Sequence, residues 1–155
     1  MHSKGVYRMN RAGVTIEILT CMDDGALEEL ENAYLTEIGE APLSEDARAR
    51  LSDAIRAERI VFFVARFQNR AIGMCSVARC FSTFACADIG IFEDFFVEPE
   101  FRKKGVARRL ASAAQTWCAE NGIASLTVTC APCDEPLYQS LGFTTRLGTA
   151  YVKLS

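Results

Sequence analysis

Residues 89–119 carry an apolar strand, a basic turn that contains a glycine, and a helix that follows the turn at once. The first N–H groups of a helix have no intrahelical partner and carry partial positive charge, and Gly105 lets the turn approach an anion closely. Five cations lie at this end of the helix: Arg102, Lys103, Lys104, Arg108 and Arg109. Because these charges are unfavourable beside the helix dipole without an anion, the segment predicts a phosphate site, with a solvated connection as the alternative.

The turn lacks both common nucleotide signatures, GxxxxGKS/T and GxGxxG, and has the pattern R-x-x-G-x-A instead. Downstream, residues 125–130 have the pattern of a buried strand, and residues 135–143 have that of a short helix ended by Gly142. With LYQSLGF in this second segment, the chain resembles the GNAT superfamily of acetyl-CoA-dependent N-acetyltransferases, strongly over residues 89–143. In that family, Q/R-x-x-G-x-G/A wraps the pyrophosphate of coenzyme A, and (F/L)YxxLGF follows the second strand of the cofactor cleft.

The resemblance implies an α/β fold, with a mixed, mostly antiparallel central sheet that is splayed at the cofactor cleft and has helices on both faces. The splay is expected between the strand that ends at Val97 and the strand that ends at Cys130. Acetyl-CoA is expected there as the cosubstrate, without a metal, and its pantetheine is expected to hydrogen-bond like an added strand. The residues expected to bind it are Phe96, Val97, Arg102, Lys103, Lys104, Gly105, Val106, Ala107 and Arg108.

Two adjacent acids, Glu93 and Asp94, interrupt the apolar strand that precedes the turn. Strand alternation predicts that they lie on opposite faces, Glu93 with Phe95 and Asp94 with Phe92, unless a bulge changes the order. An unpaired carboxylate among apolar neighbours is costly and its pKa is expected to rise, which makes both acids functional candidates. The alternative is that one of them neutralises an arginine or caps a loop.

The family chemistry gives these acids a role in preparing an amine. An amine with a pKa of about 10.4 is almost fully protonated at pH 7, and its deprotonation costs on the order of 4 to 5 kcal/mol. Glu93 is the expected base and Asp94 the group that holds the cation, while the amine attacks the thioester directly in a ternary complex. The resemblance points to the N–H of Val97 as the oxyanion donor. Tyr138, in LYQSLGF, is the expected acid for the departing thiolate, with a core aromatic as the alternative.

The acceptor is expected to be a primary amine on a small molecule. The segment EDFFV resembles polyamine and diamine acetyltransferases, whereas CAPCDEPLYQSLGF is similar to bacterial acetyltransferases of unassigned substrate. The first two helices and their link carry seven acids, and the resemblance implies that this link lies over the acceptor side of the cleft. Together with Glu93 and Asp94, these acids suggest an acidic approach for a cationic amine, with a solvated helix surface as the alternative. These acids are Glu28, Glu29, Glu31, Glu37, Glu40, Glu45 and Asp46.

Other classes of function are limited by the residues that the chain lacks. His2 is the only histidine, so histidine-dependent triads and histidine metal sites are all but excluded. Cys130 and Cys133 form a CxxC that is a weak redox or zinc candidate because no second pair accompanies it. The remaining rival is a coenzyme A-binding regulatory or protein-acetylating domain. Retention of both acids and Tyr138 favours the enzyme.

Composition agrees with one compact domain over residues 13–155, after a loose N-terminal extension over residues 1–12. The net charge of −3 argues against nucleic acid, and no apolar run reaches the length of about 20 residues that spans a membrane. The seven cysteines are odd in number and follow no secretory signal, which favours reduced thiols in the cytoplasm, most of them buried, including Cys75, Cys80, Cys86 and Cys118. A homodimer is left open as an assembly.

Periodicity predicts the remaining elements. A strand at 14–20 precedes a helix with the apolar stripe Leu27, Leu30, Tyr34 and Ile38, and Ser44 caps a second helix. Strands at 60–67 and 71–80 flank a hairpin turn, and residues 81–88 are expected to be a loop. The last two strands are expected at 143–146 and 150–154.

Overall fold

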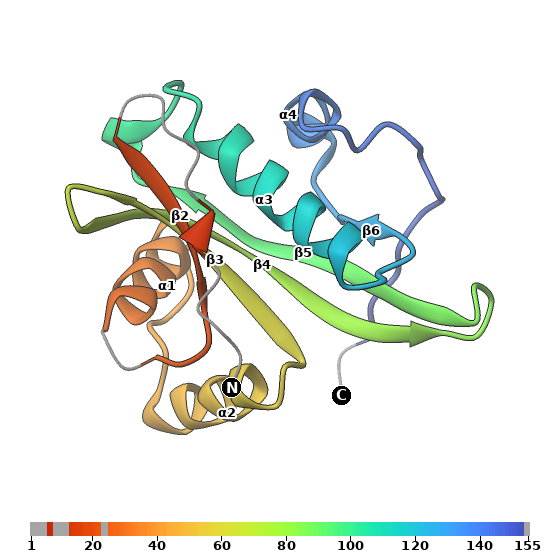
Figure 1. Cartoon of the computed structure of the whole chain (residues 1–155), viewed down its shortest axis with the longest axis horizontal. Helices are drawn as coiled ribbons and strands as arrows, with labels where there is room; N and C mark the ends of the chain where they lie inside the picture. The colour runs from red at the N-terminus through yellow and green to blue at the C-terminus, as the bar shows by residue number, and fades with distance from the viewer. Residues whose placement is uncertain (1–5, 8–12, 23–24, 154–155) are drawn as a thin grey trace.

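The computed structural model describes residues 6–7, 13–22 and 25–153, and its centre is a six-stranded sheet with the order β1-β2-β3-β4-β5-β6 (Figure 1). Neighbouring strands are antiparallel from β1 to β5, and β5 and β6 are parallel. The strands are β1 (Val6–Tyr7), β2 (Val14–Leu19), β3 (Ile60–Phe67), β4 (Arg70–Ser82), β5 (Ala87–Val97) and β6 (Leu126–Thr127). The mixed, mostly antiparallel sheet is therefore confirmed.

Helices cover both faces of the sheet, as expected (Figure 1). α1 (Ala26–Glu37) and α2 (Glu45–Arg56) pack on one face, where their core includes Leu27, Leu30 and Ile55. α3 (Val106–Glu120) packs on the other face through Val106, Leu110 and Trp117. α4 (Glu135–Ser140) follows η2 (Pro132–Asp134), and η1 (Pro99–Phe101) precedes α3.

Strand alternation separates the two cores. Phe62 and Val64 of β3 pack with α1 and α2, whereas Phe63 and Ala65 pack with α3. All four side chains are fully or almost fully buried. Phe92 and Phe96 of β5 divide between the same two cores, so β5 and the acids that it carries lie between the two packed layers.

The first two helices begin and end largely as their sequence predicts. The hydroxyl of Ser44 accepts the N–H of Ala47 and caps α2. The predicted stripe of α1 is wrong at one position, because the helix ends at Glu37 and Ile38 is the exposed C-cap residue. The other three residues of the stripe, Leu27, Leu30 and Tyr34, pack in the core between α1 and the sheet.

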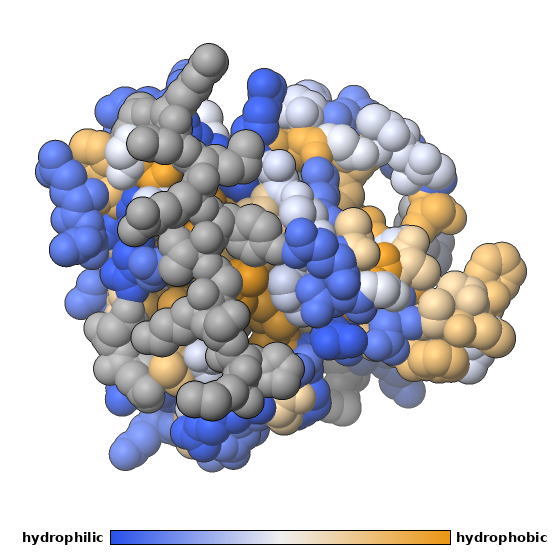
Figure 2. Space-filling model, viewed as in Figure 1, coloured by the Kyte–Doolittle hydropathy of each residue, from blue (hydrophilic) through white to orange (hydrophobic). Residues whose placement is uncertain are grey.

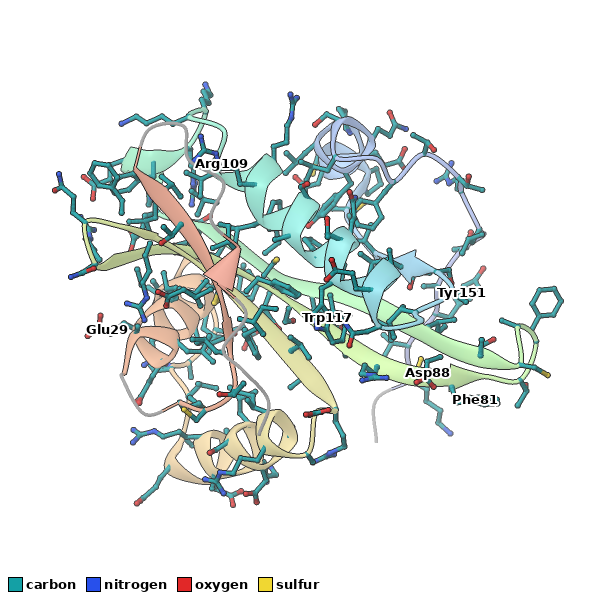
Figure 3. All side chains as sticks on the ribbon, in the orientation of Figure 1. Glu29, Phe81, Asp88, Arg109, Trp117 and Tyr151 are labelled. Atoms are coloured by element: carbon teal, nitrogen blue, oxygen red, sulfur yellow. The ribbon has the colours of Figure 1, made fainter. Side chains whose placement is uncertain are left out.

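Two hairpins join β3 to β4 and β4 to β5, and only the first was predicted from the sequence. Gln68 and Asn69 both have positive φ, as a two-residue hairpin turn requires, and the predicted hairpin is confirmed. The loop expected at 81–88 is wrong, because Phe81 pairs with Asp88 and Ser82 with Ala87. The β4–β5 hairpin projects from the body of the protein and leaves Phe81 exposed (Figures 1, 2 and 3). The strands therefore continue into a part of the hairpin that contributes nothing to the core.

The β5 strand carries a bulge on the side of β4 and separates from β6 on its other side. Ser76 of β4 lies opposite Glu93, whereas Met74 lies opposite Phe96, so β5 contains an extra residue between the two pairs. Asp94 lies in the bulge with a φ of 51°. On its other side, β5 pairs with β6 only at Gly90 and Ile91. Beyond Ile91, β5 and the chain after β6 separate, and this confirms the predicted splay.

Several expected details of the chain ends and thiols differ from the structure. Only Leu126–Thr127 of the segment 125–130 forms a strand, and residues 143–146 and 150–153 form none, while residue 154 lies outside the described part. These segments have strand-like composition but no described neighbour to pair with, and a strand needs both. Cys80 and Cys86 are exposed because they lie in the projecting hairpin.

Within residues 1–12, Val6–Tyr7 pair with β2, and the other residues of that segment lie outside the described part. Among the residues that the structure describes, no helix is long and apolar enough to cross a membrane.

Candidate active site

The turn before α3 presents a run of free backbone donors. Gly105 is the N-cap residue with a φ of 84°, and Lys103 also has a positive φ, of 59°. Within the described chain, the N–H groups from Lys103 to Arg108 donate to no protein acceptor, whereas the N–H of Arg109 bonds to the Gly105 carbonyl. A Cβ on Gly105 would meet no atom within 4 Å, so the space in front of the turn is open. Consecutive free N–H groups at a helix start fit a pyrophosphate.

The cations of the turn have two different environments. Arg102 donates its Nε–H to the Val97 carbonyl at 2.8 Å, pairs with Glu37 of α1 and lies over the Phe96 ring. Its side chain therefore ties the end of β5 to α1. Lys103, Lys104 and Arg108 are exposed and form no ion pair with any described residue. These three side chains remain available to an anion.

The open edge of β5 is formed by Val97. Glu98 donates its N–H to the Ile72 carbonyl of β4 at 3.0 Å, so the N–H of the preceding Val97 points away from β4, toward the splay. Phe96 lies opposite Met74 in the ladder, and its side chain is buried in the α1 core. Of the two residues expected to contact pantetheine, only Val97 presents its backbone at the open edge.

The bulge corrects the predicted faces of the acids. Phe92 and Phe95 lie on the same face, with ring centroids 5.2 Å apart, because the extra residue at Asp94 shifts the alternation. Ser76 lies opposite Glu93 in the ladder and donates its hydroxyl to Asp94, and Met74, two residues before Ser76, packs in the core under α1. Both acids therefore lie on the side of the sheet that carries α1, and not on opposite sides.

The environment of the two acids differs in detail. Burial raises the pKa of Asp94, although the Ser76 hydroxyl, which donates to Asp94 Oδ2 at 2.5 Å, counteracts part of the rise. Burial raises the pKa of Glu93, and the charge of Asp94 raises it further. Glu93 is the more exposed of the two side chains. Both carboxyl groups are therefore harder to ionise than an ordinary acid, and Glu93 is the one that solvent reaches more easily.

A third acid, Glu31 of α1, belongs to this group and was not singled out from the sequence. It is only 5% exposed, and its Oε1 is buried without a hydrogen-bond partner. Burial raises its pKa to about 8, and the charge of Asp94 contributes to this rise. A sequence signal did exist, because Glu31 lies four residues after Leu27 and three before Tyr34, within the buried stripe.

Tyr138 of α4 lies in an aromatic cluster at the splay. Its ring centroid is 6.5 Å from that of Phe92 and 6.0 Å from those of Phe95 and Phe143. Burial raises its pKa to about 12, and negative charge on Cys130, Asp134 and Tyr34 adds to the effect. The phenol is therefore protonated at neutral pH. The cluster holds the ring, as the core interpretation expects, and the retained proton is what an acid requires.

The acidic surface of the first two helices is partly neutralised. Glu28 pairs with Arg48, Asp46 with Arg50 and Glu37 with Arg102, while Glu31 is buried. Of the seven acids expected to form an acidic approach, Glu29, Glu40 and Glu45 remain as exposed charges without a described ion pair. Long-range attraction of cations is accordingly weaker than seven charges would give.

The CxxC of Cys130 and Cys133 shows neither a disulfide nor further metal ligands among the described residues. Cys130 and Cys133 are both free thiols, half-buried and exposed respectively. In the described part of the chain, no group of three or more His, Cys, Asp or Glu residues could hold a metal ion.

The sheet, the bulged strand and the free donors at the start of α3 define an acyltransferase of the GNAT class, and sequence comparison agrees. Residues 58–145 match the family model described as an acetyltransferase (GNAT) domain, so the chain belongs to this family. It is an acetyl-CoA-dependent acyltransferase.

The chain is also similar to individual acetyltransferases in sequence and in structure. The chain is 31% identical over 106 residues to an uncharacterized N-acetyltransferase, YhfO, of Bacillus subtilis, covering 68% of this chain and 71% of the relative. It is 29% identical over 97 residues to an aminoglycoside N(6')-acetyltransferase type 1 of Salmonella typhimurium, and the match covers 59% of this chain and 67% of that protein. A crystal structure of a probable acetyltransferase has the same fold, with a TM-score of 0.80 at 23% identity over 90% of this chain and 97% of that one.

Proposed function

We propose that this acetyltransferase transfers the acetyl group of acetyl-CoA to a primary amine on a small cationic molecule, by direct attack in a ternary complex. The observation that carries the proposal is the pair of acids at the β5 bulge, Glu93 and Asp94, beside the open N–H of Val97. Neither acid forms an ion pair with any described residue, so a cationic acceptor would supply the missing charge.

Each step of the chemistry is assigned to residues of this chain. Asp94, held by the Ser76 hydroxyl, binds the ammonium form, and Glu93 accepts its proton directly or through water. The N–H of Val97 stabilises the negative charge that develops on the thioester oxygen. Tyr138 donates its proton to the sulfur that leaves, and its high pKa keeps that proton available. One proton is released to solvent for each acetyl group transferred to an ammonium.

The turn before α3 would bind the pyrophosphate of acetyl-CoA. When bound, acetyl-CoA supplies the activated acetyl group as a thioester. The N–H groups from Lys103 to Arg108 and the side chains of Lys103, Lys104 and Arg108 would hold its pyrophosphate. Arg102 has a different role in this proposal, because its guanidinium is engaged by Glu37 and the Val97 carbonyl and so supports the strand end.

An acceptor screen tests the proposal. The protein is saturated with acetyl-CoA and offered diamines, monoamines, amino acids and aminoglycosides, and thiol release is followed. Transfer to cationic amines, with acidic amino acids rejected, is the expected result. Binding of acetyl-CoA without transfer to any amine would instead favour a regulatory or protein-acetylating domain and would refute the proposal.

A further inference from the structure

Arg102 begins the basic turn, but its guanidinium group is already engaged by the protein. Its Nε–H donates to the Val97 carbonyl at 2.8 Å, and its Nη2 pairs with Glu37, the last residue of α1. The guanidinium carbon lies 5.8 Å from the centre of the Phe96 ring. Lys103, the next residue, is exposed and forms no ion pair with any described residue. The two neighbouring cations of the turn therefore have different surroundings.

The Val97 carbonyl that Arg102 contacts lies at the open edge of β5. Gly73 of β4 lies opposite Val97, and Glu98 donates its N–H to the Ile72 carbonyl at 3.0 Å. In this register, the N–H and the C=O of Val97 both point away from β4, toward the splay. The open edge thus presents one donor and one acceptor from the same residue. Arg102 occupies the acceptor and leaves the N–H of Val97 open.

The peptide group between Val97 and Glu98 is held from both sides. Its N–H bonds to β4, and its C=O accepts the Nε–H of Arg102. On the β4 side the fit is close, because a Cβ on Gly73 would lie 2.9 Å from the Phe96 carbonyl oxygen. Since a peptide group is planar, two bonds on its opposite edges limit its rotation. This limits the direction of the neighbouring Val97 N–H as well.

An oxyanion donor affects the rate only when its direction is fixed before the reaction. Removal of one such donor costs about 10²-fold to 10³-fold in kcat. Arg102 helps to fix the Val97 N–H, and it also covers a carbonyl whose partial negative charge would otherwise be exposed at the same edge. Glu37 holds the guanidinium at that carbonyl. These contacts have their largest effect where negative charge develops, in the transition state.

We propose that Arg102, held by Glu37, is a positioning residue for acetyl transfer, which directs the Val97 N–H toward the thioester oxygen and contributes little to pyrophosphate binding. The inference rests on the proposed function, in which the Val97 N–H stabilises the developing oxyanion. The motif alone predicts instead that Arg102 binds the cofactor together with Lys103. The two roles differ in their kinetics, because a positioning residue changes kcat, whereas an anion-binding residue changes the affinity for acetyl-CoA.

Arg102→Lys is the direct test, because lysine keeps the charge but lacks the planar fork that reaches a carbonyl and a carboxylate together. With saturating acetyl-CoA and 1,4-diaminobutane, kcat is expected to fall on the order of 10-fold, since the donor is misdirected and not removed. The Kd of acetyl-CoA, measured by calorimetry, should change by less than about threefold. Lys103→Gln should show the opposite split and weaken acetyl-CoA binding more than it lowers kcat.

Arg70→Lys is the matched control. Arg70 also pairs with a glutamate, Glu100, and its guanidinium carbon lies 5.7 Å from the centre of an aromatic ring, that of Phe101. The change therefore removes the same kinds of contact at an exposed position that is not bonded to Val97. Both kcat and the Kd of acetyl-CoA should stay within about twofold of wild type.

Glu37→Gln tests the partner that holds the guanidinium and leaves every residue of the turn unchanged. It should lower kcat by a smaller factor, roughly threefold, as expected for one exposed ion pair. The double variant with Arg102→Lys should be no slower than Arg102→Lys alone, because both changes act through the same contact.

A second measurement reads the Val97 N–H without turnover. A hydrogen bond to the thioester carbonyl lowers its infrared stretching frequency, and an isotopic label at the acetyl carbonyl separates this band from those of the protein. The wild-type complex with labelled acetyl-CoA, without an amine, should show the lowered frequency. The band should move toward that of free acetyl-CoA in Arg102→Lys and stay at the wild-type position in Arg70→Lys. Circular dichroism confirms that both variants keep the fold.

The outcomes separate the inference from the proposed function. If Arg102→Lys weakens acetyl-CoA binding as much as Lys103→Gln does and leaves kcat unchanged, Arg102 is an anion-binding residue and the inference is overturned, while the proposed function stands. A fall in kcat with the carbonyl band at its wild-type position also overturns it. If the wild-type protein binds acetyl-CoA but acetylates no amine, the proposed function fails, and the carbonyl band still decides whether Arg102 positions the Val97 N–H.

Discussion

Replacing Glu31 with Gln should change how the stability of the protein depends on pH. The pKa of Glu31 is about 8 in the folded protein, against an ordinary value of 4.5. Between these values the folded state binds more protons than the unfolded state, so stability falls as pH rises. The full stability is present below pH 4.5, and the loss is complete above about pH 8.

The size of the effect follows from the two pKa values. Linkage gives a cost of about 0.8 kcal/mol at pH 5 and about 3.4 kcal/mol at pH 7 for this one group. Glu31→Gln cannot ionise, so its free energy of unfolding should gain about 2.5 kcal/mol on wild type between pH 5 and pH 7. Glu93 and Asp94 titrate in both proteins, and most of their contribution cancels in the comparison.

Urea unfolding at several pH values measures this difference, with the fluorescence of the single tryptophan, Trp117, as the signal. Trp117 is buried on α3 against Phe63, so its emission reports loss of the core (Figure 3). Glu29→Gln is the control with an exposed carboxyl on the same helix. A difference between wild type and Glu31→Gln that stays constant from pH 5 to pH 8 would refute the assigned environment of Glu31.

Four further predictions concern the catalytic cleft. Gly105→Val should abolish the rise in melting temperature that acetyl-CoA causes, because a β-branched residue is strained at a φ of 84°, whereas Gly122→Val at the other end of α3 should retain it. Tyr138→Phe should keep acetyl-CoA affinity in calorimetry and lose on the order of 100-fold in turnover. Glu93→Gln should lower kcat at neutral pH and recover in part at high pH, where more amine is already deprotonated, as a pH–rate profile would show. For a diamine, kcat/KM should fall only modestly as salt rises, because several acids of α1 and α2 are already ion-paired.

Contrary results would have specific meanings. If acetyl-CoA still raised the melting temperature of Gly105→Val, the pyrophosphate would have to bind somewhere other than the turn before α3. Unchanged turnover in Tyr138→Phe, measured in a single-turnover experiment so that product release cannot mask it, would remove this residue from the mechanism. Equal losses at all pH values in Glu93→Gln would indicate a structural role for that carboxyl.

Much of the fold follows from local sequence patterns. The turn at Gln68 and Asn69, the cap at Ser44 and the apolar face of α3 are each specified by a few neighbouring residues. The strand, turn and helix around Gly105 also follow from sequence, because the positive φ and the helix start are local properties. These elements were predicted at nearly their observed positions.

The errors arise where the outcome depends on distant partners. Residues 143–146 have strand-like composition but no described neighbour to pair with. Residues 81–82 and 87–88 are strand ends because the β4–β5 hairpin continues its pairing beyond the body of the protein. The bulge at Asp94 is set by its pairing with β4, and it moved Phe95 to the face of Phe92. Strand parity alone could not reveal it.

The acids Glu31, Glu93 and Asp94 show that burial which depends on a distant partner cannot be predicted from the local sequence. Glu93 and Asp94 stand out in the sequence because they interrupt an apolar strand. Glu31 lies among seven acids of two surface helices, and its burial depends on how α1 packs against β4 and β5. Its position in the buried stripe was the available signal, but one helix position does not decide burial without the partner element.

The central claim, acetyl transfer to an amine, is tested most directly by identifying the product. The enzyme is incubated with acetyl-CoA and 1,4-diaminobutane, and both the released thiol and the mass of the diamine are measured. The expected result is one acetyl group on a diamine nitrogen for each coenzyme A released, with both products formed more slowly by Glu93→Gln at neutral pH. Thiol release without any acetylated diamine, through hydrolysis or acetylation of protein lysines alone, would contradict the claim.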